Sequence, residues 1–200
     1  MIDPIYAVID TNVVVSAMLT HNPESPTRCL LERVKDGQII PMINESILDE
    51  YIEVLARPKF CLNKSRVLEV RELFLCRGLK CEPVTLCMDF IDPDDQVFYE
   101  TYREREDAYL VTGNLRHYPS EPRIILPADM LRVINILEVL PGGVLSDSPC
   151  EYLSEEKKNR IQRAWEAIEQ CIHDAVANSM SDMSMEEIDE EIRLYRQSKK

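Results

Sequence analysis

Residues 7–16 read Ala-Val-Ile-Asp-Thr-Asn-Val-Val-Val-Ser, and this stretch decides the fold. Its apolar, β-branched start is typical of a strand buried on both faces of a parallel sheet. The strand ends at Asp10, and burying a carboxylate is costly unless a partner or a ligand compensates for it. Open α/β sheets bind their ligands beyond the carboxyl ends of the strands. Asp10 is therefore the first candidate for a functional site.

Short apolar strands alternate with amphipathic helices through residue 140. Strands are predicted at 5–10, 39–43, 108–112 and 123–126, with a short strand or extended connection at 84–86. Helices are predicted from Ser25 to Gly37, over 47–55 and 64–77, from 92–95 onward, and over 130–140. This alternation predicts an α/β fold with a parallel sheet and helices on both faces. Right-handed crossovers then place Asp10, Asn44 and Asn114 at one edge of the sheet.

A Pro/Gly-rich and Ser-rich break follows the last of these helices. We therefore divide the chain into a domain at 1–140, a linker at 141–153 and a helical C-terminal extension at 154–200. The extension holds one long helix, whose predicted apolar stripe is Ile161, Trp165, Ile168, Ile172 and Val176. Ser184 and Glu187 form a capping box before a last short helix. Such helices must pack on the domain, on a second copy or on a partner.

Composition narrows the classes of function. The chain has 36 acidic and 23 basic residues and a net charge of −13, which argues against binding nucleic acid through a broad basic surface. A nuclease remains open, since a bound cation can bring phosphates to an acidic cleft. Seven Cys without a CxxC pair favour free thiols over zinc or disulfides. With no signal peptide and no long apolar run, we expect a cytoplasmic protein without a membrane span.

Three acidic residues stand out, although each has a simple structural alternative. Asp10 could be a turn residue at a strand end. Glu50 could be a solvated helix residue, like its neighbours Asp49 and Glu53. Asp95 could merely favour the dipole of the helix that it opens. Taken one at a time, the three signals are weak.

Four segments carry these acids and a late strand end. They are 8–13 (Val-Ile-Asp-Thr-Asn-Val), 50–60 (Glu-Tyr-Ile-Glu-Val-Leu-Ala-Arg-Pro-Lys-Phe), 92–98 (Asp-Pro-Asp-Asp-Gln-Val-Phe) and 109–114 (Tyr-Leu-Val-Thr-Gly-Asn). In order and spacing, over roughly residues 5–140, the chain resembles the PIN-domain ribonucleases, especially the VapC-like bacterial toxins. The resemblance implies a PIN-like three-layer α/β/α sandwich with a central parallel sheet.

The resemblance also implies a metal site and a reaction. Asp10, Glu50 and Asp95 would be the catalytic, metal-binding acids, and hard oxygen ligands favour Mg²⁺ or Mn²⁺. Such an ion activates water and neutralises charge that builds up on a phosphodiester. The implied activity is endonucleolytic hydrolysis of RNA by in-line attack, leaving 5′-phosphate and 3′-hydroxyl ends.

The sequence departs from the family at its fourth acidic position, where it has Asn114. This departure favours one metal ion over two, and it leaves open a catalytically weak or inactive PIN-like module that binds RNA or protein. A phosphohydrolase of another α/β family would need a second Asp where this chain has Asn12. Asn12, Thr112 and Asn114 are predicted as supporting polar residues. Residues that could contact RNA are Arg57, Lys59, Arg116 and His117.

The expected partners are an RNA substrate, a small antitoxin, and further copies of the chain in a homodimer or higher oligomer. Residues 184–196 resemble the C-terminal ends of some small antitoxins. This likeness suggests that the extension docks near the active edge or mediates antitoxin binding. The alternative is a solvated helix that trails the domain.

Overall fold

The computed structural model describes residues 4–82, 90, 93–139, 154–180 and 183–199. One parallel sheet forms its centre, with the strand order β3-β2-β1-β4-β5. The strands are β1 (Ile5–Ile9), β2 (Ile39–Ile43), β3 (Leu79–Lys80), β4 (Tyr109–Val111) and β5 (Ile124–Ile125). The predicted α/β class with a parallel sheet is confirmed. Because β1 pairs with β4 in the register Ile9 to Val111, the residues after both strands reach the same edge.

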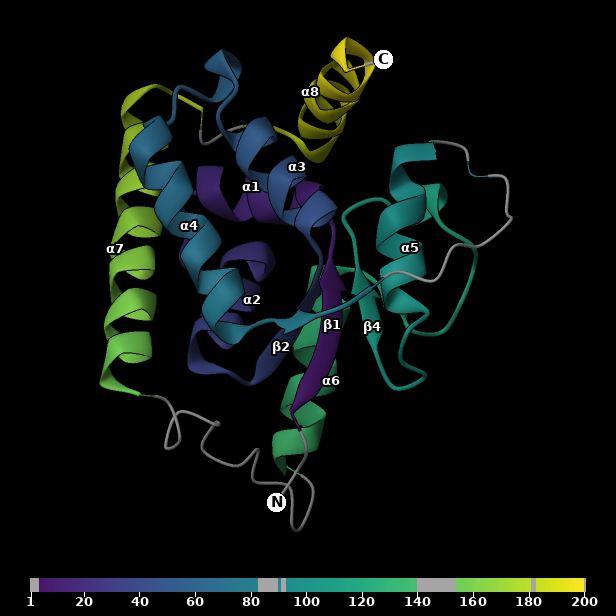
Figure 1. Cartoon of the computed structure of the whole chain (residues 1–200). Coiled ribbons are helices and arrows are strands. Elements are labelled where there is room, and N and C mark those ends of the chain that lie inside the picture. The colour runs from purple at the N-terminus through teal and green to yellow at the C-terminus, as the bar shows by residue number, and fades with distance from the viewer. Residues whose placement is uncertain (1–3, 83–89, 91–92, 140–153, 181–182, 200) are drawn as a thin grey trace.

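Helices cover both faces of the sheet. They are α1 (Thr11–Leu19), α2 (Pro26–Asp36), α3 (Glu45–Leu55), α4 (Lys64–Arg77), α5 (Gln96–Tyr102), α6 (Pro127–Val139), α7 (Glu155–Ala177) and α8 (Met185–Ser198). Helix α5 lies on one face and α2 and α4 lie on the other, which gives the predicted PIN-like three-layer α/β/α arrangement (Figure 1). No helix in the described ranges is both long enough and apolar enough to span a membrane.

Two elements differ from the sequence-based expectations. Helix α1 was not predicted, because its residues are buried on nearly every side and show no polar face. The edge strand lies at 79–80, directly after α4. The expected strand at 84–86 and the helix start at Asp92 lie outside the described residues. The cysteines that the structure describes are free thiols, namely Cys29, Cys61, Cys76, Cys81 and Cys171.

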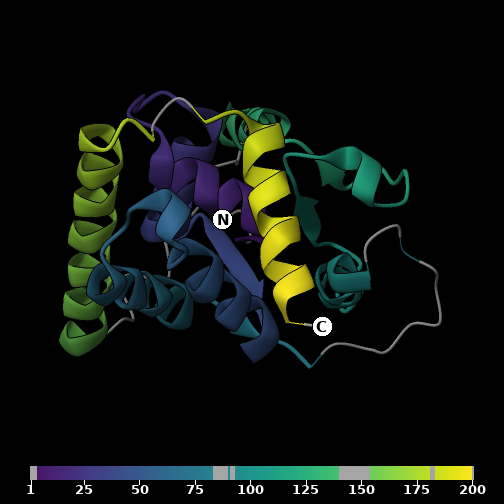
Figure 2. The ribbon, with the colours of Figure 1, turned by 90° about the horizontal axis from the view of Figure 1, so that it is seen from above.

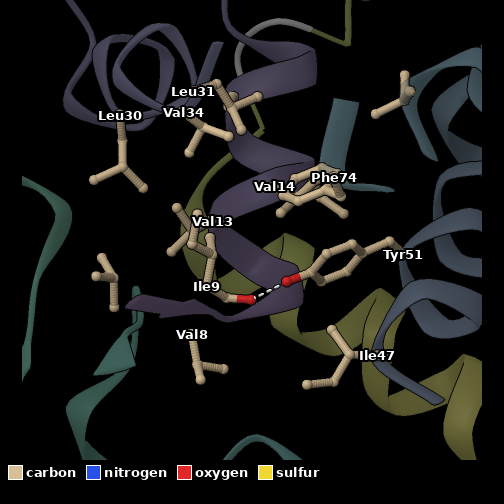
Figure 3. Close-up of a cluster of buried hydrophobic side chains, with 14 of the residues drawn as sticks. Val8, Ile9, Val13, Val14, Leu30, Leu31, Val34, Ile47, Tyr51 and Phe74 are labelled. Atoms are coloured by element: carbon tan, nitrogen blue, oxygen red, sulfur yellow. Dashed lines mark hydrogen bonds between the residues drawn. The ribbon is translucent and has the colours of Figure 1, made fainter. Parts of the chain in front are cut away.

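A buried tyrosine joins α3 to the end of β1. The hydroxyl of Tyr51 donates a hydrogen bond to the backbone carbonyl of Ile9, and the Tyr51 ring packs 5.0 Å from that of Phe74 (Figure 3). At the start of the same helix, the Asn44 side chain caps α3 by accepting from the backbone N–H of Ile47 at 2.9 Å. These contacts fix the residue before Tyr51, Glu50, beside the strand end that carries Asp10.

The long helix of the extension packs against the rest of the fold. Helix α7 lies along α4 on the side away from the sheet and also contacts α1 (Figure 1). Ile161, Trp165 and Ile168 are buried as predicted, but Val176 is 44% exposed, since the later turns bury smaller residues instead. The predicted linker lies mostly outside the described residues, so the domain boundaries stay a prediction.

Replacing Ile168 by alanine tests whether α7 is integral to the fold. Ile168 is fully buried, so Ile168→Ala should lower the free energy of unfolding by about 2–4 kcal/mol through lost burial and a residual cavity. The matched control is Val176→Ala on the same helix, which should change it by about 0.5 kcal/mol or less. Urea denaturation measures both, and equal small effects would mean that α7 is detached in solution.

Candidate active site

The site lies at the edge of the sheet where β1 and β4 end. Asp10 directly follows β1, is 3% exposed, and its backbone N–H donates to the carbonyl of Val111 at 2.9 Å. One of its carboxylate oxygens, Oδ2, accepts from Thr112 Oγ1 at 2.7 Å, from the Tyr118 hydroxyl at 3.2 Å and from Asn12 Nδ2 at 3.3 Å. Three donors on one oxygen hold this carboxylate in a single orientation.

Charge accumulates around Asp10. Burial and the negative charge of Asp95 raise the pKa of Asp10 to about 7, although Arg196 and the Thr112 hydroxyl act in the opposite direction. A raised pKa of this origin means that the carboxylates repel one another in a desolvated place. A cation beside such a cluster favours its ionised form.

An arginine from the last helix provides a cation. Arg196 is 6% exposed, and its Nη2 donates to Glu50 Oε1 at 2.8 Å while its Nη1 donates to Asp95 Oδ1 at 2.7 Å. Glu50 also accepts from Thr11 Oγ1 at 2.6 Å. Burial lowers the pKa of Arg196, but the two carboxylates outweigh burial and raise it above its ordinary value. The guanidinium therefore stays charged between the two acids.

A second contact with α8 occupies the position of the missing fourth acid. Asn114 Nδ2 donates to Asp189 Oδ2 at 3.1 Å, and Asn12 Nδ2 donates to Asp189 Oδ1 at 3.0 Å. Asn12 is held in turn by the backbone N–H of Gly113, which donates to Asn12 Oδ1 at 2.9 Å. Asn114 thus receives a carboxylate from the extension instead of contributing one.

Room remains between α8 and the edge of the sheet. A cavity of about 620 Å³ is lined by residues that include Asp10, Asp95, Asn114 and Asp189. Within the described part of the chain, no three carboxylate, imidazole or thiol groups are arranged to hold a metal ion in this conformation. The donors themselves suit a hard cation, because Asp10, Glu50 and Asp95 offer only oxygen atoms and already surround one positive group.

Comparison with known proteins identifies the family. The sequence pattern of the PIN domain matches residues 6–116, more than half of the chain. The chain belongs to the PIN-domain family. PIN domains are in general nucleases, enzymes that hydrolyse phosphodiester bonds. No curated protein and no solved structure shows a significant match to the chain.

The predicted basic residues of this PIN domain have different surroundings. His117 Nδ1 lies 3.1 Å from Asp95 Oδ2, and this contact raises the pKa of His117 against the effect of burial. Arg57 Nε lies 2.5 Å from Glu191 Oε1, so it contacts α8. Lys59 and Arg116 are exposed on short 3-10 helices. The structure therefore brings only His117 of these four onto the predicted acids.

At this edge the sequence analysis missed Thr11 and Tyr118, which donate to Glu50 and Asp10, and it also missed two residues of α8, Arg196 and Asp189. They lie seven positions apart, two turns on one side of α8, and α8 was predicted as an amphipathic helix. The likeness of 184–196 to antitoxin ends was a pointer to docking near the site. It did not show which side chains would reach the acids.

Replacing Asp10 by asparagine tests the crowding of charge in this PIN domain. In wild type without metal, the contribution of Asp10 to the free energy of unfolding falls as the pH rises from about 4 to about 7, because the unfolded Asp10 ionises near its ordinary value while the folded one keeps its proton. Asn keeps the hydrogen-bond acceptor and removes the charge. As the pH rises from 5 to 8, the free energy of unfolding of Asp10→Asn should therefore increase by about 2–3 kcal/mol relative to that of wild type. Urea denaturation in EDTA measures the two free energies of unfolding. A difference between them that does not change with pH would contradict the raised pKa of Asp10.

Proposed function

We propose that the protein is a metal-dependent endoribonuclease in which Asp10, Glu50 and Asp95 bind Mg²⁺ or Mn²⁺. The observation that carries the proposal is that these acids come from three separate segments and converge around one cation, the Arg196 guanidinium. Buried carboxylates without such a function would be expected to be replaced by apolar residues, since burying them is unfavourable. RNA as the substrate class rests on the resemblance to the PIN-domain ribonucleases.

The surrounding residues position the acids for this chemistry. An ion bound there supplies an activated water and positive charge against the phosphodiester. Thr112 and Tyr118 orient Asp10, and Thr11 orients Glu50, so each carboxylate directs an oxygen without further rearrangement. His117 Nδ1 lies 3.1 Å from Asp95 Oδ2, and this contact limits how far the Asp95 side chain can turn. Because Asn114 brings no charge, we propose one ion.

A narrower biological role rests on the resemblance alone. The role as toxin of a type II toxin–antitoxin pair, the small antitoxin, the homodimer or higher oligomer, and the cytoplasmic location all stay predictions. The second candidate function is a PIN-like module that binds RNA or protein without cleaving it. The observation in its favour is that Arg196 and Asp189 cover the acids and Asn114.

Removal of one metal-binding acid tests the nuclease. With RNA and Mn²⁺ or Mg²⁺, we expect cleavage that EDTA abolishes, and Glu50→Gln should lower its rate at least ~100-fold, since even residues that only support ligands cost 10–100-fold. The matched control is Asp49→Asn, the preceding and exposed residue of α3, which should leave the rate unchanged.

Each substitution is also made in an Arg196→Ala background, so that a site held closed by Arg196 does not hide the activity. Cleavage that persists in EDTA or in Glu50→Gln would exclude the assigned site. RNA binding without cleavage in both backgrounds would favour the binding module.

A further inference from the structure

Helix α8 lies across the carboxyl end of the sheet, directly over the acids. Figure 2 shows it in yellow beside α1 and α3, both of which it contacts. Its apolar side is buried through Ile188, Ile192 and Tyr195. Met185 fills the space over Gly113, where an added Cβ would lie 2.6 Å from the Met185 sulfur. The helix therefore packs closely on part of this edge, beside the cavity that Asp10 and Asp95 line.

The polar contacts of α8 are made with the proposed machinery itself. Arg196 donates hydrogen bonds to the carboxylates of Glu50 and Asp95, and Asp189 accepts hydrogen bonds from the side-chain amides of Asn12 and Asn114. Further pairs around them join Arg57 to Glu191 and Glu53 to Tyr195 and Lys199. A solvated trailing helix would have no reason to match the charges of this edge residue by residue.

We propose that α8 is an intramolecular inhibitor that closes the site by placing Arg196 where the metal would bind. A divalent ion needs carboxylate oxygens at about 2.0–2.6 Å. The Arg196 nitrogens already lie 2.7 and 2.8 Å from Asp95 and Glu50 oxygens, and two cations a few ångströms apart repel each other. Metal and docked α8 therefore exclude each other. The inference rests on the proposed metal site.

The contact between Asn114 and Asp189 explains why an uncharged residue stands at position 114. Asp189 lies 3.1 Å from the Asn114 amide, so an aspartate at position 114 would place two carboxylates against each other. Asparagine instead donates a hydrogen bond to Asp189. Asn114 and Asp189 are thus a matched pair, and the uncharged residue at the edge is the one that allows α8 to dock.

Release of α8 does not require the rest of the extension to move. Helix α7 buries its own apolar side against α4 and α1 and is anchored by ion pairs of Arg66 with Asp174 and of Arg160 with Glu72. These contacts involve no residue of α8. The inhibitor is therefore a separable end of a firmly attached extension.

Metal affinity tests the inference independently of RNA cleavage. In Mn²⁺ titration by calorimetry, Arg196→Ala in the full chain should bind at least ~10-fold more tightly than wild type, because the competing guanidinium is gone. The matched control is Arg193→Ala, an exposed arginine of the same helix that pairs with Glu190 and should leave the affinity unchanged. Equal or weaker binding by Arg196→Ala would overturn the inference.

Hydrogen exchange reports on α8 directly and covers the case in which Arg196→Ala loosens the fold. Adding Mn²⁺ to wild type should speed the exchange of α8 amides and leave α7 amides unchanged. In EDTA, Asn114→Asp should speed α8 exchange, and Asn114→Asp combined with Asp189→Asn should restore it. Slow α8 exchange under saturating Mn²⁺, or no rescue by the double variant, would contradict the inference.

The two proposals fail in different ways. If Arg196→Ala binds Mn²⁺ tightly but cleaves no RNA, the proposed nuclease activity is excluded and the proposed competition between α8 and the metal is supported. If wild type cleaves RNA in a metal-dependent way and Arg196→Ala binds Mn²⁺ no more tightly than wild type, the proposed inhibition by α8 is excluded and the proposed nuclease activity is supported.

Discussion

Buried carboxylates at the carboxyl end of a parallel sheet need positive charge beside them, and this requirement shapes the whole active edge. The register of β1 and β4 places Asp10 there, and the bond from Tyr51 to Ile9 brings α3 and Glu50 to the same place. The cation in this structure is Arg196, which lies 146 residues after Glu50. The last helix is therefore tied electrostatically to the first strand.

Much of this arrangement could be predicted from local sequence. Buried strands and amphipathic helices leave periodic patterns, and right-handed crossovers place the strand ends Asp10, Asn44 and Asn114 at one edge. The grouping of Glu50 and Asp95 with Asp10 was implied by the resemblance to the PIN-domain ribonucleases. The prediction failed where the pattern was uniform. Helix α1 is apolar on nearly all sides, so its sequence reads as a continuation of the apolar strand before it.

The covering of the site could not be predicted in the same way. The sequence of α8 shows a capped amphipathic helix with many charges, but which charges meet depends on how the helix lies on a surface built from distant segments. Arg193 and Arg196 look alike in the sequence. One pairs with Glu190 at the surface, and the other is buried between two acids. Only the tertiary structure shows that Arg193 is a surface residue and that Arg196 occupies the proposed metal site.

Charge balance also explains why such a closure can be reversible. One guanidinium faces three acids, and Asp189 adds a further carboxylate at the same edge, so the negative charge is only partly compensated. Burial, together with the negative charge of Asp95 and Glu50, raises the pKa of Asp10 to about 7 even with Arg196 in place. A divalent ion brings twice the charge of a guanidinium and would compensate it better. With Asn114 in place of a fourth acid, less negative charge is left uncompensated at this edge. Helix α8 can therefore stay docked there until a divalent ion competes with Arg196.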